Sequence, residues 1–358
     1  DWACIATGAI SVPVYATSSP DQILYIVNHS EAKLIFAEAA VLPVLDSLKA
    51  QLPSVTHAIN MDIHADATDN KPSLNQWLQL ALPAQPVVES QADDLLTICY
   101  TSGTTGNPKG VMITHGNLMA AIDAHLKGVE FNRGDRSLAA LPLSHIFERG
   151  WSYIALYAGG HNHYLADINQ LQAQLQEVKP HTFCAVPRIF EKIHAGIFLK
   201  AEHAGWVNVA ILKWAEARVR RNQQRTAHGK KLSAYAKFMQ SLATRLVGKK
   251  IANALGGHIR FMPCGGAALD SDIHGFFMGL GINIKIGYGM TETLATVSFM
   301  PDTHYALGSL GKPMAGIEIK IAQSNNEMVG RSPSMTKGYY KDEKATRELI
   351  QDGWLHTG

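Results

Sequence analysis

Cysteine is scarce in this sequence, which has four among 358 residues: Cys4, Cys99, Cys184 and Cys264. They lie far apart with no Cys-x-x-Cys pair, which argues against a disulfide framework and a cysteine-rich zinc site and makes a reducing cytoplasm the expected location. No apolar run reaches the roughly 18 residues that cross a bilayer. Charged residues make up 17% and hydrophobic residues 46%, so the composition is not that of a disordered chain. The sequence therefore predicts a soluble globular protein.

No signal peptide is visible in this sequence, since it contains no basic segment followed by an apolar one before a cleavage site. The sequence begins with Asp1 rather than Met, and its first residues read like an interior segment. We therefore interpret it as a piece of a longer protein, long enough for two or three domains.

Acidic residues are nearly missing from one region, although the formal charge of the whole sequence is only +2. Residues 200–250 contain 12 Lys or Arg and 2 acidic residues, a local charge of +10 that leaves −8 for the rest. Apolar residues are interleaved with these charges, so the segment predicts an amphipathic helical surface able to approach anionic lipid. A solvated helical face is the alternative.

Short apolar, β-rich runs alternate with helical patterns over most of the sequence, which predicts an α/β fold with parallel strands joined by helices. We expect strands at 95–100, 111–114, 138–141, 182–186, 259–262 and 283–286, and helices at 117–126, 146–157, 171–178, from 188 onward and at 271–280. The expected domains are a first α/β subdomain over 13–134 and a second over 135–297 with a helical basic insert at 195–255. A β-rich subdomain over 298–358, part of a small β-barrel, follows.

The most informative segment is residues 100–110, Tyr-Thr-Ser-Gly-Thr-Thr-Gly-Asn-Pro-Lys-Gly. Its glycines permit a tight backbone whose amides face an anion, its hydroxyls can donate to phosphate oxygens, and Lys109 supplies positive charge. It differs from the loop Gly-x-x-x-x-Gly-Lys-Ser/Thr, because Lys109 follows Gly106 by three positions and a strand-forming run comes next. The composition predicts a triphosphate-binding loop, with a plain surface turn as the alternative.

This segment resembles the signature loop of the adenylate-forming superfamily of acyl-CoA synthetases, luciferases and peptide-synthetase adenylation domains. Six further segments match in the family's order: residues 141–148 (Leu-Pro-Leu-Ser-His-Ile-Phe-Glu), 265–269 (Gly-Gly-Ala-Ala-Leu), 287–293 (Gly-Tyr-Gly-Met-Thr-Glu-Thr), 308–313 (Gly-Ser-Leu-Gly-Lys-Pro), 337–340 (Lys-Gly-Tyr-Tyr) and 352–358 (Asp-Gly-Trp-Leu-His-Thr-Gly). Each match alone is weak evidence, but seven in order leave little room for chance.

The resemblance implies a site for ATP and Mg²⁺. It assigns catalytic roles to Lys109, Thr291 and Glu292, with Thr291 at the α-phosphate and Glu292 holding Mg²⁺ together with Thr104. The remaining ATP-binding residues implied by the resemblance are Thr101, Ser102, Gly103, Thr104, Thr105, Gly106, Gly265, Gly266, Ala267, Ala268, Tyr288 and Gly289. Tyr288 is expected against the adenine and the small residues 265–268 against its flat face.

The same resemblance assigns the carboxylic substrate to His145, Phe147 and Gly287. We expect His145 to shape substrate entry rather than act as a general base, because a carboxylate is already ionised at pH 7. A satisfied core histidine is the alternative. Glu148 and Arg149 are interpreted as a structural ion pair.

Residues 141–149, the run Val-Pro-Arg at 186–188 and the helical insert resemble the long-chain fatty acyl-CoA synthetases. The implied function is ATP-dependent activation of a long-chain fatty acid to acyl-adenylate and then acyl-CoA, with coenzyme A as co-substrate and AMP and pyrophosphate released. The implied partners are the fatty acid, ATP and CoA, without nucleic acid. The expected location is the cytoplasm, and the basic insert is expected to contact a membrane surface. Whether the protein forms a homodimer is left open.

Other functions remain open at this point. A fatty acyl-AMP ligase that serves a carrier protein, or an adenylating enzyme for another carboxylate, shares the same motifs. A non-catalytic nucleotide- or lipid-binding module is the alternative from a different class, against which the joint presence of Lys109, Thr291 and Glu292 argues. The family's mobile C-terminal domain, with its catalytic lysine, is not in the sequence, and residues 325–333 fit the family pattern poorly, so Arg331 has no assigned role.

Overall fold

The computed structural model describes residues 1–62, 73–80, 86–101, 107–227, 231–294, 296–302, 305–323 and 325–358. They form two compact units, one of residues 1–117 and 336–352 and the other of residues 118–335 and 353–358. Within the described ranges, no helix combines the length and apolar character needed to span a membrane. The three-part division expected from the sequence differs from these units and stays a prediction.

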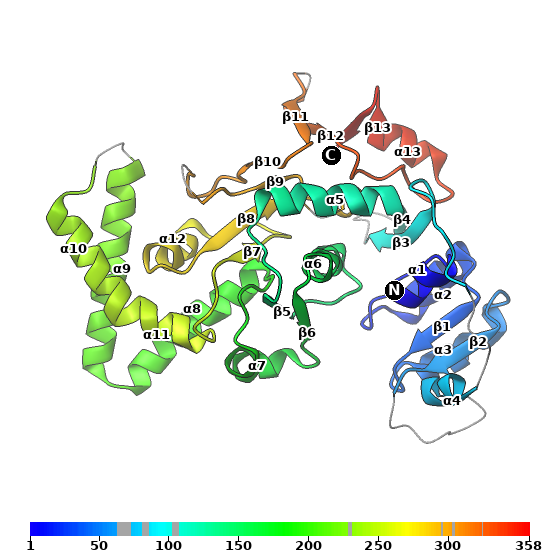
Figure 1. Ribbon diagram of the computed structural model, residues 1–358, viewed down its shortest axis with the longest axis horizontal. Helices are drawn as coiled ribbons and strands as arrows, with labels where there is room; N and C mark the ends of the chain where they lie inside the picture. Colours follow the sequence, from blue (N-terminus) through cyan, green and yellow to red (C-terminus); the bar gives the residue numbers. More distant parts are fainter. Residues whose placement is uncertain are drawn as a thin grey trace. The chain divides into compact units, whose positions relative to one another are not determined.

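Unit 1 contains two small sheets and short helices (Figure 1). Its elements are α1 (Trp2–Thr7), α2 (Pro20–Ser30), β1 (Leu34–Ala37), α3 (Leu42–Leu48), the 3₁₀ turn η1 (Lys49–Gln51), β2 (His57–Asn60), α4 (Leu74–Gln79), β3 (Leu95–Thr101), β4 (Lys109–Thr114), the start of α5 (His115–Gly128), α13 (Glu343–Leu349) and β13 (Ile350–Gln351). Strands β1 and β2 are parallel, whereas β3 and β4 are antiparallel. Strands β3 and β4 therefore depart from the parallel arrangement expected over most of the sequence, because the connection between them is too short for a crossover.

Unit 2 contains most of the helices. After α5 come β5 (Arg136–Ala139), α6 (Ile146–Tyr157), β6 (His161–Tyr164), the 3₁₀ turn η2 (Ile168–Gln170), α7 (Leu171–Val178), α8 (Pro187–His203), α9 (Trp206–Ala227), α10 (Ala234–Ala243), the π turn η3 (Thr244–Gly248), α11 (Lys249–Ala254), β7 (Met262–Cys264), α12 (Ser271–Gly279), β8 (Ile284–Tyr288), the 3₁₀ turn η4 (Thr291–Thr293), β9 (Ser298–Phe299), β10 (Lys312–Pro313), β11 (Glu318–Ile321), β12 (Met328–Arg331) and β14 (Trp354–His356).

The central sheet of unit 2 is mostly parallel. Strand β5 pairs with β6, and β7 pairs with β8, both in parallel. The segment expected as a strand at 182–186 makes isolated parallel bridges at Thr182 and Ala185, which join β5 on one side to Phe261 and β7 on the other. Strands β9 and β10 continue the sheet in antiparallel fashion from β8.

An extensive apolar core lies between this sheet and the helices α8, α9 and α12. Phe183, Phe190, Phe277 and Ile284 are completely buried in it. Burial on both faces explains why the strands read as continuous apolar runs rather than as alternating ones. The α/β class predicted from the sequence is confirmed.

Residues 325–333, which fit the family pattern poorly, contribute a strand to a regular β-sheet. Strands β11, β12 and β14 form an antiparallel sheet. Arg331 on β12 donates to both carboxylate oxygens of Glu318 on β11 at 2.9 Å, and its guanidinium lies 5.0 Å from the ring centroid of Trp354 on β14. Arg331 thus links these three strands.

Candidate active site

A cavity in unit 2 opens at the carboxyl ends of β7 and β8, where α/β proteins bind ligands. Its volume is ≈ 490 Å³, including space open to solvent. The chain segments that form it are the end of α5, the start of α6, the loops after β7 and β8, and the approach to β9. Its lining residues are His125, His145, Ile146, Phe147, Trp151, Pro263, Cys264, Gly265, Gly266, Gly287, Gly289, Met290, Thr296 and Phe299.

Bare backbone shapes the floor of this cavity. A Cβ atom at Gly265 would lie 3.3 Å from the Gly287 carbonyl oxygen, and one at Gly287 would lie 3.2 Å from the Phe299 ring. Gly266 has φ +85°, a conformation that is strained for residues with side chains. Ala267 and Ala268 continue the same loop as exposed residues. Side chains are thus excluded where β7 and β8 end, which leaves bare backbone facing the cavity.

His145 lies at the rim and caps α6. Its Nδ1 accepts a hydrogen bond from the Phe147 backbone N–H at 3.2 Å. Surrounding protein atoms lower the pKa of the imidazole, although the ring keeps access to solvent. The neutral ring, with Nδ1 as an acceptor, carries its proton on Nε2. His145 can therefore donate one hydrogen bond to a ligand at this rim.

The strand-to-helix loop that carries His145 is held by a buried carboxyl group. Glu148 on α6 is completely buried, and its Oε2 accepts from the backbone N–H groups of Ala140 at 3.2 Å and Leu141 at 3.0 Å. Desolvation raises its pKa to about 8. The expected Glu148–Arg149 ion pair is wrong, because Glu148 instead binds the backbone at the end of β5.

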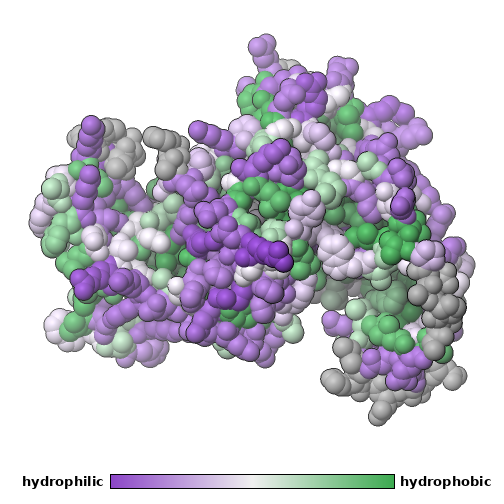
Figure 2. Space-filling view, in the orientation of Figure 1, coloured by the Kyte–Doolittle hydropathy of each residue, from purple (hydrophilic) through white to green (hydrophobic). Residues whose placement is uncertain are grey.

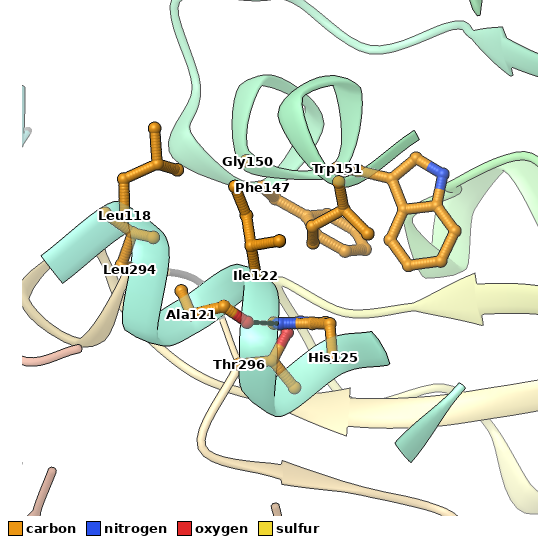
Figure 3. A pocket seen from close by; sticks show the side chains of 10 residues that line it. Leu118, Ala121, Ile122, His125, Phe147, Gly150, Trp151, Leu294 and Thr296 are labelled. Atoms are coloured by element: carbon orange, nitrogen blue, oxygen red, sulfur yellow. Dashed lines mark hydrogen bonds between the residues drawn. The ribbon is translucent and has the colours of Figure 1, made fainter. Parts of the chain in front are cut away.

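A second, narrower cavity adjoins the first, and the two share His125, Phe147, Trp151 and Thr296. Figure 3 shows α5 contributing Leu118, Ala121, Ile122 and His125 opposite residues of α6. The volume is ≈ 280 Å³, including solvent-accessible space, and the lining is almost wholly apolar. The lining suits an apolar group.

Gly150 faces this second cavity from within α6, and a Cβ atom placed there would meet no other atom within 4 Å. Glycine in a helix costs about 1 kcal/mol relative to alanine. Because no steric contact requires glycine here, the residue chiefly preserves open space.

The sequence interpretation missed His125 and Gly150. His125 is buried, and its Nδ1–H donates to the Ala121 carbonyl at 2.7 Å, which leaves Nε2 as an acceptor. Burial lowers its pKa, so the ring is neutral. The sequence could have indicated His125 through its position on the apolar face of the expected helix, three residues after Ile122 and four after Ala121.

The remaining residues of the 287–293 segment lie next to the first cavity. Tyr288 is half-buried at the end of β8. Thr291 and Glu292 lie in the η4 turn directly after Met290, and Glu292 is 6% exposed. The Thr293 hydroxyl closes this turn, because it accepts from the Met290 N–H and donates to the Met290 carbonyl, both at 3.0 Å.

The phosphate-loop segment belongs to unit 1. Ser102, Gly103, Thr104, Thr105 and Gly106 lie outside the described residues. Thr101 ends β3 and pairs with Lys109, the exposed first residue of β4.

The Lys-Gly-Tyr-Tyr segment at 337–340 supports Lys109. The Tyr340 N–H donates to the Gly110 carbonyl at 2.7 Å, and Met112 donates to Gly338 at 3.0 Å. These bonds align the segment with β4. The Lys109 ammonium consequently lies 5.0 Å from the Tyr339 ring centroid, a cation–π contact.

The described side chains do not by themselves form a complete metal site. The described ranges contain no group of three or more His, Cys, Asp or Glu side chains able to hold a metal ion. Mg²⁺ in phosphate enzymes is usually bound by one or two carboxylates together with substrate phosphates. A site of that kind needs one protein carboxylate, and Glu292, in the η4 turn beside the first cavity, could supply it.

Comparison with known proteins agrees with this organisation. The family model described as "AMP-binding enzyme" matches residues 1–340. Long chain acyl-CoA synthetase 7, peroxisomal, of Arabidopsis thaliana is 34% identical over 386 aligned residues, which cover 100% of this chain and 53% of that protein. Long-chain-fatty-acid–CoA ligase FadD15 of Mycobacterium tuberculosis is 31% identical, over 100% of this chain and 60% of its own length. The chain therefore spans little more than half of these relatives.

Solved structures show the same fold. The inhibitor-bound N-terminal domain of FACL13 from Mycobacterium tuberculosis superposes with a TM-score of 0.73 at 23% identity, over 98% of this chain and 76% of that one. The anthranilate CoA ligase AuaEII in complex with anthranoyl-AMP gives a TM-score of 0.74 at 20% identity, over 98% and 60%.

Proposed function

Because the chain belongs to the family of AMP-binding enzymes, we propose that the full protein activates a long-chain fatty acid with ATP and transfers the acyl group to coenzyme A. The observation that carries the proposal is the pair of adjoining cavities, one with a bare-backbone floor beside a histidine donor and one apolar. The names of the relatives, long-chain acyl-CoA synthetase and long-chain-fatty-acid–CoA ligase, support the choice of substrates.

In the first step a carboxylate oxygen of the fatty acid attacks the α-phosphorus of ATP. An O–P bond forms, the bond to the pyrophosphate oxygen breaks, and acyl-adenylate and pyrophosphate result. In the second step the sulfur of CoA attacks the acyl carbonyl and AMP leaves. The carboxylate is ionised at pH 7 and needs no general base, so positioning and charge neutralisation provide most of the catalysis.

The residues of the first cavity have separate proposed roles. Gly265, Gly266, Ala267 and Ala268 would accept the flat adenine against backbone, with Tyr288 beside it. The Nε2–H of His145 would donate to a carboxylate oxygen and orient it for attack. His145 is suited to this because its lowered pKa keeps it neutral and its tautomer is fixed by Phe147. A neutral donor orients the nucleophile without a strong ion pair that would weaken its reactivity.

The negative charge of the ATP phosphates must be neutralised by cations. Lys109 would bind the β- and γ-phosphates together with the loop residues 101–106, and Thr291 would contact the α-phosphate. Glu292 would hold Mg²⁺, with Thr104 as the second protein ligand. Bound magnesium neutralises phosphate charge; the protein's part is to supply a fixed oxygen ligand and to orient the phosphates.

The acyl chain would enter the second cavity, between α5 and α6. The Gly150→Val variant tests this, because its added methyl groups would extend into the open space that Gly150 faces. We expect kcat/KM for palmitate to fall about tenfold, equivalent to about 1.4 kcal/mol, with little change for a short-chain acid. Gly196 in α8 offers a matched control, since it is also a helical glycine with nothing within 4 Å of an added Cβ but is no part of either cavity.

The assay is AMP release by the full-length protein, measured with palmitate and with shorter acids in the presence and absence of CoA. The proposal predicts release that requires both palmitate and CoA. Release without CoA but with an acyl carrier protein would identify a fatty acyl-AMP ligase instead. Equal loss of palmitate activity in the Gly150 and Gly196 variants would contradict the acyl role of the second cavity.

A further inference from the structure

The insert carries an exposed apolar stripe on one side of a helical run. Tyr235 and Phe238 on α10 are 64% and 65% exposed, and Leu246 in η3 is 41% exposed. Half-buried Leu242 lies between them, so the four residues follow one another at intervals of three or four positions. Such spacing places residues on one face of a helix. A neighbouring face of the same helical run packs inward through Ala236, Ala243 and Val247, so the stripe is not needed for the core of this chain.

Cations border the stripe on two sides. On α9, Arg218 lies with its guanidinium 5.8 Å from the Tyr235 ring centroid, and Arg221 and Arg225 follow on the same helix face. On the other side, Arg245, Lys249 and Lys250 are exposed beside Leu246.

These cations have no acidic partner among the residues that the structure describes. Arg220 makes the one ion pair that the structure records for basic residues between 200 and 250, with Asp272 at 3.2 Å. In the described part of this region, none of the six cations that border the stripe has a carboxylate within ion-pair distance. The positive charge of these six side chains is therefore available to a ligand at the surface.

Figure 2 shows hydrophobic and hydrophilic residues interleaved over the part of the molecule where Figure 1 places α9 and α10. Exposed aromatic rings among unpaired cations match the interface of an anionic bilayer, where rings enter the headgroup region and cations meet lipid phosphates. A polyanion such as RNA would account for the cations but not for an apolar stripe.

We propose that the face formed by Tyr235, Phe238, Leu242 and Leu246, with its bordering arginines and lysines, binds the surface of membranes that contain anionic phospholipid. Binding is peripheral: the rings lie among the headgroups while the cations contact lipid phosphates. The proposal does not depend on the proposed enzymatic activity, because vesicle binding is measured without ATP or fatty acid. If both hold, the enzyme works where long-chain fatty acids partition.

The test is co-sedimentation of the full-length protein with vesicles of phosphatidylcholine alone or mixed with phosphatidylglycerol, at low and high salt. We expect binding to the mixed vesicles that weakens with salt and little binding to phosphatidylcholine. Each cation near an anionic surface contributes about 1 kcal/mol, so the double variant Arg245→Gln and Lys249→Gln should bind roughly thirtyfold more weakly. Phe238→Ser should weaken binding about tenfold.

Matched controls come from exposed residues of the other compact unit. Lys33→Gln with Lys344→Gln removes two exposed cations, and Leu78→Ser removes an exposed apolar side chain on α4. Both controls should bind mixed vesicles like the wild type, and unchanged circular dichroism and melting temperature would show that the insert variants fold.

Three results would overturn the proposal. One is failure of the wild type to bind mixed vesicles at low salt. A second is equal binding by the insert variants and their controls. The third is a Phe238→Ser variant that loses self-association or RNA binding but keeps vesicle binding, which would assign the stripe to a second copy or to nucleic acid.

Discussion

Burial of Glu148 should make the stability of this protein fall as pH rises through the neutral range. The carboxyl group is completely buried, and desolvation raises its pKa from the ordinary 4.5 to about 8, although the Leu141 and Ala140 amides favour the charged form. Its Oε1 is buried and has no hydrogen-bond partner in the described residues. In the unfolded chain the group ionises near its ordinary pKa. The folded protein therefore holds a proton that the unfolded chain has lost, and stability decreases with pH over this window.

The expected size follows from the pKa difference. Each pH unit between the two pKa values costs at most 1.36 kcal/mol, so about 5 kcal/mol would be lost over the whole window. Glu148→Gln removes the titration but keeps an oxygen that accepts from Ala140 and Leu141. Between about pH 5.5 and about pH 8 the wild type should lose roughly 3 kcal/mol relative to this variant. Buried groups that Glu148 does not influence are present in both proteins and cancel in the difference.

Urea unfolding followed by tryptophan fluorescence measures this difference, and Trp151 reports on the same helix as Glu148. Glu191→Gln is the control, because Glu191 is exposed on α8; its difference from the wild type should stay constant with pH. A constant difference for Glu148→Gln as well would show that Glu148 is ionised in the folded protein and that the reasoning is wrong.

Three further predictions concern the nucleotide site and the fold. Lys109→Ala should lower kcat/KM for ATP ten- to a hundredfold through lost charge-assisted phosphate contacts, and unchanged ATP kinetics would remove Lys109 from the site. Glu292→Gln should reduce adenylate formation, measured as pyrophosphate release, by about two orders of magnitude, with partial recovery at raised magnesium; wild-type activity at low magnesium would place the metal elsewhere. Gly311→Ala should destabilise unit 2 by about 3 kcal/mol or more, because its φ is +88° and a Cβ would lie 2.2 Å from the Phe299 backbone, whereas Gly316→Ala, with φ +77° and open space, should cost about 1 kcal/mol in thermal unfolding. Similar melting temperatures for these two glycine variants would contradict the packing argument.

Local sequence patterns predicted much of the fold. The helices at 146–157 and 171–178 have the expected bounds, because their periodic apolar residues end at turn-forming positions. The strand expected at 259–262 instead runs from Met262 to Cys264, since pairing with β8 decides where it ends. Residues 182–186 have the apolar pattern of a strand but make only isolated bridges. Their backbone N–H groups also form single hydrogen bonds to neighbouring strands instead of a continuous ladder.

The sequence predicted the site residues only where a motif marks them. His145, Phe147, Gly265, Gly287 and their neighbours line one cavity, but their roles stay predictions. Gly150 and His125 lie in ordinary helical patterns, and their importance comes from an opposing helix that no local pattern reveals. The partner of Glu148 could not be predicted either, because its two amides lie across a loop and belong to the backbone, which has no sequence signature.

The π turn η3, between α10 and α11, fixes the rotation of one helix relative to the other. Such a turn contains one residue more than an α-helical turn, so it acts as a spacer in the helical register. It lies where Gly248 lets the chain approach the Leu280 carbonyl, with no room for a side chain. The extra residue is absorbed within this one turn, so the helices on either side keep their own faces: Ile251 on α11 is buried, and Phe238 on α10 is exposed. Deleting one residue from η3 would leave an α-helical turn and largely preserve these faces. Deleting one residue within α11, where no π turn compensates, would instead turn the residues that follow by about 100°.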